Sequence, residues 1–155
     1  ARLTTFLHTE LDPQGIGYQI NQALLAIGSG GFLGVGYGHS RQKFQYLPEV
    51  GSDSIFAVIG EEMGFVVCVI ILVLFLLFLW RALSIASRAP DNFSKYVVVG
   101  VAAWIVIQAL VNIASMVALM PMTGIPLPFI SYGGTSLAIS MAAVGVMLNI
   151  SKVSR

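Results

Sequence analysis

The fold is decided by residues 55–80, which read IFAVIGEEMGFVVCVIILVLFLLFLW. From Met63 to Trp80 this stretch carries no charged side chain and is apolar throughout. A helix needs about 20 such residues to cross the hydrocarbon core of a bilayer. Residues 55–80 therefore predict a transmembrane helix, and the rest of the chain can be placed relative to it.

The composition of the whole chain agrees with a membrane protein. The sequence has 155 residues, of which 57% are hydrophobic and only 10% charged, whereas soluble domains carry about a quarter charged residues. The formal net charge of +1 argues against nucleic acid as a partner, which would require a clustered basic surface. Cys68 is the single cysteine, so an internal disulfide is excluded.

Two more spans follow the first. No charged residue occurs between Tyr96 and Ser151, and a segment rich in proline and glycine, residues 121–135, divides this region into spans at 96–120 and 136–150. Within residues 96–120, Gln108, Asn112 and Ser115 form one polar stripe at helical spacing. A polar stripe is costly against lipid, so it predicts a hydrogen-bonded seam, with contact to substrate as the alternative.

Basic residues set the expected orientation. Residues 81–95 and the tail 151–155 hold an excess of lysine and arginine, so the positive-inside rule places both in the cytoplasm. Residues 1–54 and 121–135 are then extracytoplasmic loops. The predicted fold is all-α, a polytopic membrane fragment with three transmembrane helices and a large outer loop. The chain begins with Ala1, and we expect it to be the C-terminal part of a longer protein.

The loop at 1–54 is expected to contain a short helix at the membrane interface. Ile20, Ala23, Leu24 and Ile27 recur at the spacing of one helical face, and the remaining positions are polar. Six glycines in residues 28–38 then predict the end of the helix and a close-packed loop. These glycines do not have the spacing of a nucleotide-binding loop.

A cluster of charged residues lies just before and at the start of the first span. The charged residues of this region are Arg41, Lys43, Glu49, Asp53, Glu61 and Glu62. Basic groups and carboxylates at a membrane surface suggest work on an anionic, lipid-linked substrate. Asp53 is a candidate proton acceptor, and the alternative, favoured by composition alone, is a helix N-cap.

Two glycines at the start of the span also leave alternatives open. Gly60 and Gly64 have the small-xxx-small spacing that lets a neighbouring helix approach closely. The alternative is that they only loosen the entry of the helix. Neither a spacing of metal ligands nor a catalytic triad is present in the sequence, so no cofactor is implied, and a need for a divalent cation is left open.

Two blocks of sequence resemble a known family. They are residues 42–64, with YLPE at 46–49, Asp53 and FAVIGEE at 56–62, and residues 121–136, with LPFISYGG at 127–134. In this order they strongly resemble the SEDS family of shape, elongation, division and sporulation proteins, closest to its cell-division members. The resemblance covers essentially the whole chain.

The resemblance implies a function. SEDS proteins are multi-pass proteins of the bacterial cytoplasmic membrane that polymerise lipid II into glycan strands. The resemblance therefore implies a peptidoglycan glycosyltransferase in which Asp53 is the catalytic base. This replaces the interpretation of Asp53 as a helix N-cap, which composition alone favoured. The substrate-binding residues are expected to be Arg41, Lys43, Glu49, Ser131, Gly133 and Gly134. Gly51-Ser52 replaces the family's usual His-Thr before the aspartate.

Partners also follow from the resemblance. Lipid II, an undecaprenyl-pyrophosphate-linked glycan strand, membrane lipid and a class B penicillin-binding protein are expected. Two alternatives remain: a transporter of lipid-linked precursor, and a non-catalytic scaffold that docks a partner helix on Gly60 and Gly64. The earlier helices of the family are not part of these 155 residues, so we expect this chain alone to be inactive.

Overall fold

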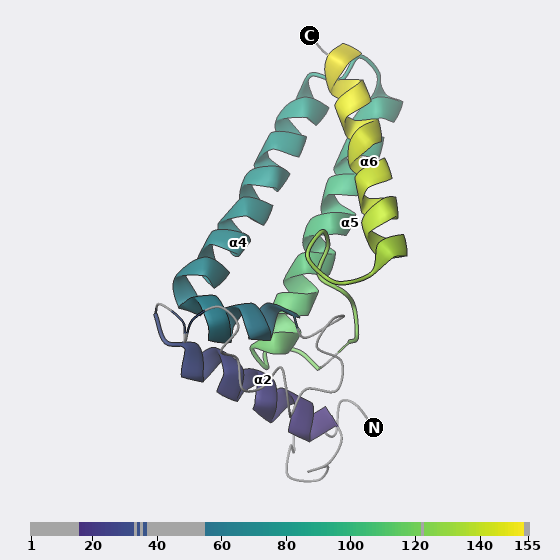
Figure 1. Cartoon of the computed structure of the whole chain (residues 1–155). Coiled ribbons are helices and arrows are strands. Elements are labelled where there is room, and N and C mark those ends of the chain that lie inside the picture. Colours follow the sequence, from purple (N-terminus) through teal and green to yellow (C-terminus); the bar gives the residue numbers. More distant parts are fainter. Residues whose placement is uncertain (1–15, 33, 35, 37–54, 122, 154–155) are drawn as a thin grey trace.

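The computed structural model describes residues 16–32, 34, 36, 55–121 and 123–153. Within these residues the secondary structure is entirely helical: α2 (Ile16–Gly30), α4 (Ile55–Ser87), α5 (Asn92–Met116) and α6 (Gly134–Val153). The predicted all-α architecture is confirmed. Helices α4, α5 and α6 are long and apolar enough to cross a membrane, and α2 lies across one end of them (Figure 1). We call this end of the bundle the α2 end.

Helix α4 is bent rather than straight. Gly64 has φ 81° and ψ 178°, a conformation outside the helical region, so the helix is two segments joined at this residue. The first segment runs beside α2, and the second rises along α5 (Figure 1). The helix also continues to Ser87, seven residues beyond the Trp80 boundary of the expected span, so the connection to α5 is tighter than the segment 81–95.

A short turn joins α4 to α5. Asp91 is the N-cap of α5, and its carboxylate accepts hydrogen bonds from the backbone N–H of Ser94 at 2.9 Å and from the Ser94 hydroxyl at 2.8 Å. These bonds to the charged form lower the pKa of Asp91. The cap therefore holds the first turn of α5 where the chain reverses direction.

Two apolar clusters hold the helices together. The cluster near the α2 end joins α2, both segments of α4, α5 and the loop before α6, and its buried members include Ala23, Phe75, Ile105 and Leu127. The second cluster lies near the α4–α5 turn and is built largely from small residues; its buried members are Ala82, Ala86, Val98, Ala102 and Met147. Small side chains let helices approach closely where lipid gives no hydrophobic drive to associate.

Helix α6 is the least buried of the three spans. Only Ser140 and Met147 are buried along it, and apolar side chains such as Ile139 and Leu148 are more than half exposed. An apolar helix of this kind is stable when its open faces meet lipid or other membrane helices.

Candidate functional site

Two structures frame the candidate site: a joint between the glycine-rich segment and α4 at the α2 end, and a loop that folds back from that end between the helices (Figure 1). Asp53, Arg41, Lys43 and Glu49 lie outside the described residues. Ser131, Gly133 and Gly134 belong to the fold-back loop and the start of α6.

The joint closes the gap that the bend leaves in α4. At Gly64 the helical hydrogen-bond pattern is broken, so N–H groups of the next turn lose their usual acceptors. The N–H of Phe65 donates to the carbonyl of Gly31 at 2.9 Å, and that of Val66 donates to the carbonyl of Phe32 at 3.4 Å. The rings of Phe32 and Phe65 also meet edge to face, with centroids 6.3 Å apart. The glycine-rich segment thus caps the second half of α4.

Glycine is required at several positions of this joint. A Cβ atom at Gly30 would collide with the backbone carbonyl of Gly60, and one at Gly34 would collide with that of Glu62. Gly34 also has a φ of +81°, which disfavours any side chain. The N–H of Gly36 donates to the carbonyl of Glu62 at 3.1 Å. The expected close-packed loop is therefore present, and its partner is the backbone of α4.

The two glycines at the start of α4 have different roles. At Gly60 a Cβ would meet Ile27 of α2 at 3.2 Å and Cys68 at 3.4 Å, so this glycine does allow a close helix approach. Gly64 instead forms the bend. The scaffold alternative, in which a partner helix docks on Gly60 and Gly64, is wrong in this form because the chain's own α2 already covers Gly60.

Both carboxylates of the first segment are buried. Glu61 is 4% exposed and Glu62 is 7% exposed, and both take part in polar interactions within the chain. Buried carboxylates are costly unless they are paired or hydrogen-bonded. The start of α4 is therefore a tightly held element, and its first residue, Ile55, follows Asp53 by two positions.

The fold-back loop is pinned by the polar stripe of α5. The side-chain amide of Gln108 donates to the carbonyl of Pro126 at 2.9 Å, and that of Asn112 donates to the carbonyl of Ile125 at 2.7 Å. Ser115 bonds to the carbonyl of Asn112 within its own helix. The prediction of a hydrogen-bonded seam is confirmed for the first two residues, and the loop is their acceptor.

Internal bonds fix the shape of the same loop. The Ser131 hydroxyl accepts from the N–H of Leu127 at 2.7 Å, and the N–H of Ser131 donates to the carbonyl of Leu127 at 3.0 Å. Leu127 is 1% exposed. Phe129, at the tip of the turn, has φ 66°, a strained value for a bulky residue. The predicted substrate residue Ser131 thus has a structural role in locking this turn.

Gly133 and Gly134 start α6. The carbonyl of Gly133 accepts from the N–H of Leu137 at 2.9 Å, and neither glycine is among the described residues with positive φ. A Cβ at Gly134 would have no atom within 4 Å. The fold itself does not require glycine at Gly134, which suits close approach of another molecule to the backbone.

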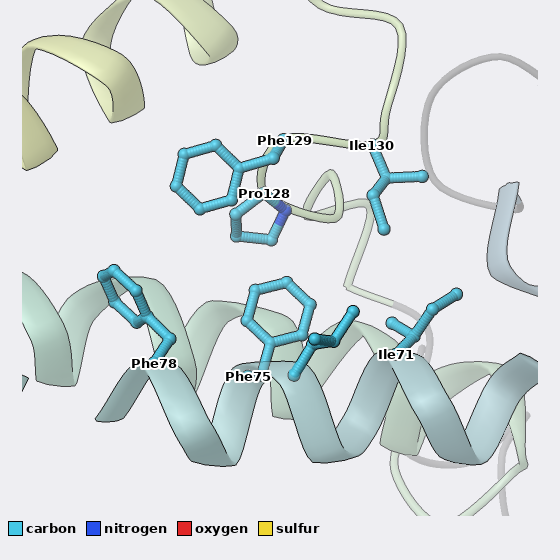
Figure 2. Close-up of a pocket in the computed structure, with 7 residues that line it drawn as sticks. Ile71, Phe75, Phe78, Pro128, Phe129 and Ile130 are labelled. Carbon is cyan, nitrogen blue, oxygen red and sulfur yellow. The ribbon is translucent and has the colours of Figure 1, made fainter. Parts of the chain in front are cut away.

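An apolar pocket of about 230 Å³ lies between the loop and α4. Figure 2 shows Phe129 and Ile130 of the loop facing Phe78 and Ile71 of the helix, with Pro128 above Phe75. No sequence pattern indicated this pocket, because its two walls are 50 residues apart and meet only through the fold. In the part of the chain that is described, no group of three or more histidine, cysteine or acidic residues is placed to hold a metal ion.

Taken together, these features define a polytopic membrane protein in which the glycine-rich segment and the fold-back loop are anchored by backbone and amide hydrogen bonds to the spans. Sequence comparison gives the family. A family model described as "Cell cycle protein", for FtsW, RodA and SpoVE, matches residues 1–155. The chain belongs to this family, which is the SEDS family that its motifs resemble.

Individual relatives agree. The chain is 51% identical to "Stage V sporulation protein E" of Bacillus subtilis over 99% of its own length and 42% of the relative. It is 48% identical to "Probable peptidoglycan glycosyltransferase FtsW" of Trichlorobacter lovleyi over 97% of its own length and 39% of the relative. The chain therefore spans about two fifths of the curated relatives it matches.

A solved structure is similar in fold. It is described as "Structural coordination of polymerization and crosslinking by a peptidoglycan synthase complex". The TM-score is 0.79 and the identity 29%, covering 99% of this chain and 41% of that chain. The helical arrangement described above is thus shared with a component of that complex.

Proposed function

We propose that the protein to which these residues belong is a peptidoglycan glycosyltransferase that polymerises lipid II outside the bacterial cytoplasmic membrane. Relatives 48% and 47% identical bear the name "Probable peptidoglycan glycosyltransferase FtsW". Because the chain covers about two fifths of their length, the activity is assigned to the whole protein.

The observation that carries the catalytic assignment is the anchoring of α4 directly after Asp53. The first segment of α4 is buried, packs on α2 and is fixed by the joint at Gly64. A catalytic group is effective when a rigid element holds it close to its productive position. Asp53, two residues before this element, is therefore a better candidate for the base than a carboxylate remote from it.

In the proposed reaction Asp53 takes the proton from a sugar hydroxyl of the acceptor lipid II. The hydroxyl oxygen attacks the anomeric carbon of the growing strand and forms the new glycosidic bond. The bond from that carbon to undecaprenyl pyrophosphate breaks, and the pyrophosphate leaves with the electron pair. The proton held on Asp53 is then released to solvent.

The negative charge of the pyrophosphate leaving group has to be balanced by positively charged side chains. Arg41 and Lys43 are assigned to the pyrophosphate, Arg41 by its bidentate fork and Lys43 as a point charge, and Glu49 to the sugar. At the other side of the site, Gly133 and Gly134 place open backbone at the first turn of α6. The N–H groups of a helix N-terminus attract anions, so this turn is assigned to the substrate as well.

Transport of lipid-linked precursor is the second candidate. It needs a polar path for the head group through the bundle. The polar stripe on α5 suits either function, and the amides of Gln108 and Asn112 bind loop carbonyls, so the stripe does not distinguish transport from glycosyl transfer. A class B penicillin-binding protein is the proposed partner, in keeping with the synthase complex of similar fold.

The test is Asp53→Asn in the full-length parent, assayed for polymerisation of purified lipid II. Asparagine caps helices about as well as aspartate, so folding is expected to survive while proton transfer is lost. Positioned proton transfer contributes about 10²–10⁴-fold, and we expect a fall of that order at matched protein level.

Glu49→Gln is the comparison at a neighbouring carboxylate. Because Glu49 is assigned to the sugar, we expect this variant to raise the KM for lipid II and to keep kcat. Near-normal polymerisation by Asp53→Asn would leave Asp53 as a cap only, and a loss of kcat in Glu49→Gln alone would move the catalytic assignment to Glu49. A parent that moves lipid II across vesicles without polymerising it would establish the transporter instead.

A further inference from the structure

The pocket between α4 and the fold-back loop lies at membrane depth. Phe75, in its floor, is about 16 Å along α4 from Gly64 at a rise of about 1.5 Å per residue, and the hydrocarbon core is about 30 Å thick. The other wall of the pocket, residues 128–130, belongs to the fold-back loop and is not helical. The pocket therefore lies within the apolar length of α4.

The loop wall is rigid. Hydrogen bonds from Gln108 and Asn112 hold the two residues before Leu127, and the Ser131 hydroxyl closes the turn. Phe129 keeps a left-handed backbone, φ 66°, at a cost of about 1–3 kcal/mol. Pro128, directly before it, is buried, whereas Phe129 remains 40% exposed. The fold thus presents this ring over the pocket instead of burying it.

The pocket has a direction. Along α4 it runs from Ile71, opposite Ile130, to Phe78, beside Phe129 (Figure 2). Ile71 is the lining residue nearest to Gly64 and so to the α2 end. Ile130 is followed directly by Ser131 and then by Gly133, which begins the proposed substrate turn. A chain lying in the pocket would leave it on the side where the head group of a lipid has its proposed site.

The lining and the size fit a hydrocarbon chain. The seven lining residues are Ile71, Leu74, Phe75, Phe78, Pro128, Phe129 and Ile130, all of them apolar. At about 230 Å³ the pocket exceeds the ~150 Å³ of an apolar protein cavity that accepts benzene. The space is wide enough for a branched chain, and it is lined by three aromatic rings.

We propose that this pocket holds the part of the polyprenyl chain nearest the pyrophosphate of the lipid-linked substrate. The proposal rests on the proposed function, which supplies a polyprenyl lipid as substrate. The pocket then positions that lipid so that its pyrophosphate lies at the outer loops, and it contributes to selection of polyprenyl over ordinary acyl chains.

Direct binding is tested first, without any assay of activity. The full-length parent in nanodiscs is irradiated with a polyprenyl phosphate that carries a diazirine near its phosphate, and labelled peptides are identified by mass spectrometry. We expect labels in residues 71–78 and 128–130 that unlabelled polyprenyl pyrophosphate removes and excess phosphatidylglycerol does not. Labels elsewhere, or equal competition by phosphatidylglycerol, would overturn the proposal.

A filled pocket provides the second test. Leu74→Trp adds bulk at a lining residue that is 59% exposed, and Leu77→Trp makes the same change on α4 at a residue that is 52% exposed and outside the lining. We expect Leu74→Trp alone to abolish the competed labelling and to raise the KM for lipid II about tenfold, equivalent to about 1.4 kcal/mol, with kcat kept. Equal effects of the two variants would refute the pocket.

The two tests separate this proposal from the proposed function. Competed labelling in a parent that does not polymerise lipid II would keep the polyprenyl site and remove the glycosyltransferase assignment. Polymerisation without labelling in residues 71–78 and 128–130 would do the reverse.

Discussion

At the scale of single residues, glycines decide how the glycine-rich segment meets α4. The sequence leaves open whether Gly60 and Gly64 form a helix contact or only loosen the entry of the helix, because spacing alone cannot distinguish the two. The structure separates them: Gly60 meets Ile27, and Gly64 takes φ 81°. The glycines at 30 and 34 were predicted to end a helix and to form a close-packed loop, but not to pack on α4, since their partner backbone is about 30 residues further along the chain.

Gly34→Ala tests the joint. The new Cβ would collide with the Glu62 carbonyl at a residue whose φ is +81°, so we expect a loss of about 1–3 kcal/mol and a lower Tm in detergent. Gly28→Ala is the matched control, because a Cβ there has no atom within 4 Å and alanine favours a helix by about 0.5–1 kcal/mol. Equal Tm values for the two variants would contradict a tightly packed joint.

At the scale of elements, the sequence predicted the seam but not its acceptor. The spacing of Gln108 and Asn112 shows that one helical face is polar, which is a local property. Their acceptors, the carbonyls of Pro126 and Ile125, belong to a loop without hydrophobic periodicity, and its fold back into the bundle is set by tertiary packing. For this reason the pocket could not be predicted either.

Asn112→Leu tests the pinning of the loop. Asn112 is 1% exposed, and leucine would leave the Ile125 carbonyl without this donor, at a cost of about 1–3 kcal/mol. We expect a lower Tm and faster proteolysis or thiol labelling at an Ile130→Cys reporter. Asn149→Leu makes the same change at an exposed position of α6 and should leave both readouts unchanged; a matching loss there would point to a general effect of removing an amide.

At the scale of the whole molecule, the sequence predicted the membrane spans but not how they pack against one another. The three apolar helices were predictable because length and composition suffice to identify a span. Their contacts were not, since α6 has too few buried residues to show a strong periodic pattern. Of the predicted site, the structure describes Ser131, Gly133 and Gly134, while the assignments of Asp53, Arg41, Lys43 and Glu49 stay predictions.

The orientation is tested by thiol labelling of the full-length parent in intact cells. The distribution of lysine and arginine predicts that Ser40→Cys reacts with a membrane-impermeant reagent from outside and that Ser154→Cys reacts only after permeabilisation. The native Cys68 is buried, so we expect little background labelling of its thiol. Outside labelling at both positions would reverse the assignment of the tail.

The bend at Gly64 also has a consequence for the bilayer itself. The straight apolar part of α4, from Phe65 to Trp80, is about 24 Å long at a rise of about 1.5 Å per residue, shorter than a typical hydrocarbon core of about 30 Å. Helix α6, from Gly134 to Ser151, reaches only about 27 Å by the same measure. Where lipid borders these two helices directly, a bilayer slightly thinner than average matches their apolar length without hydrophobic mismatch.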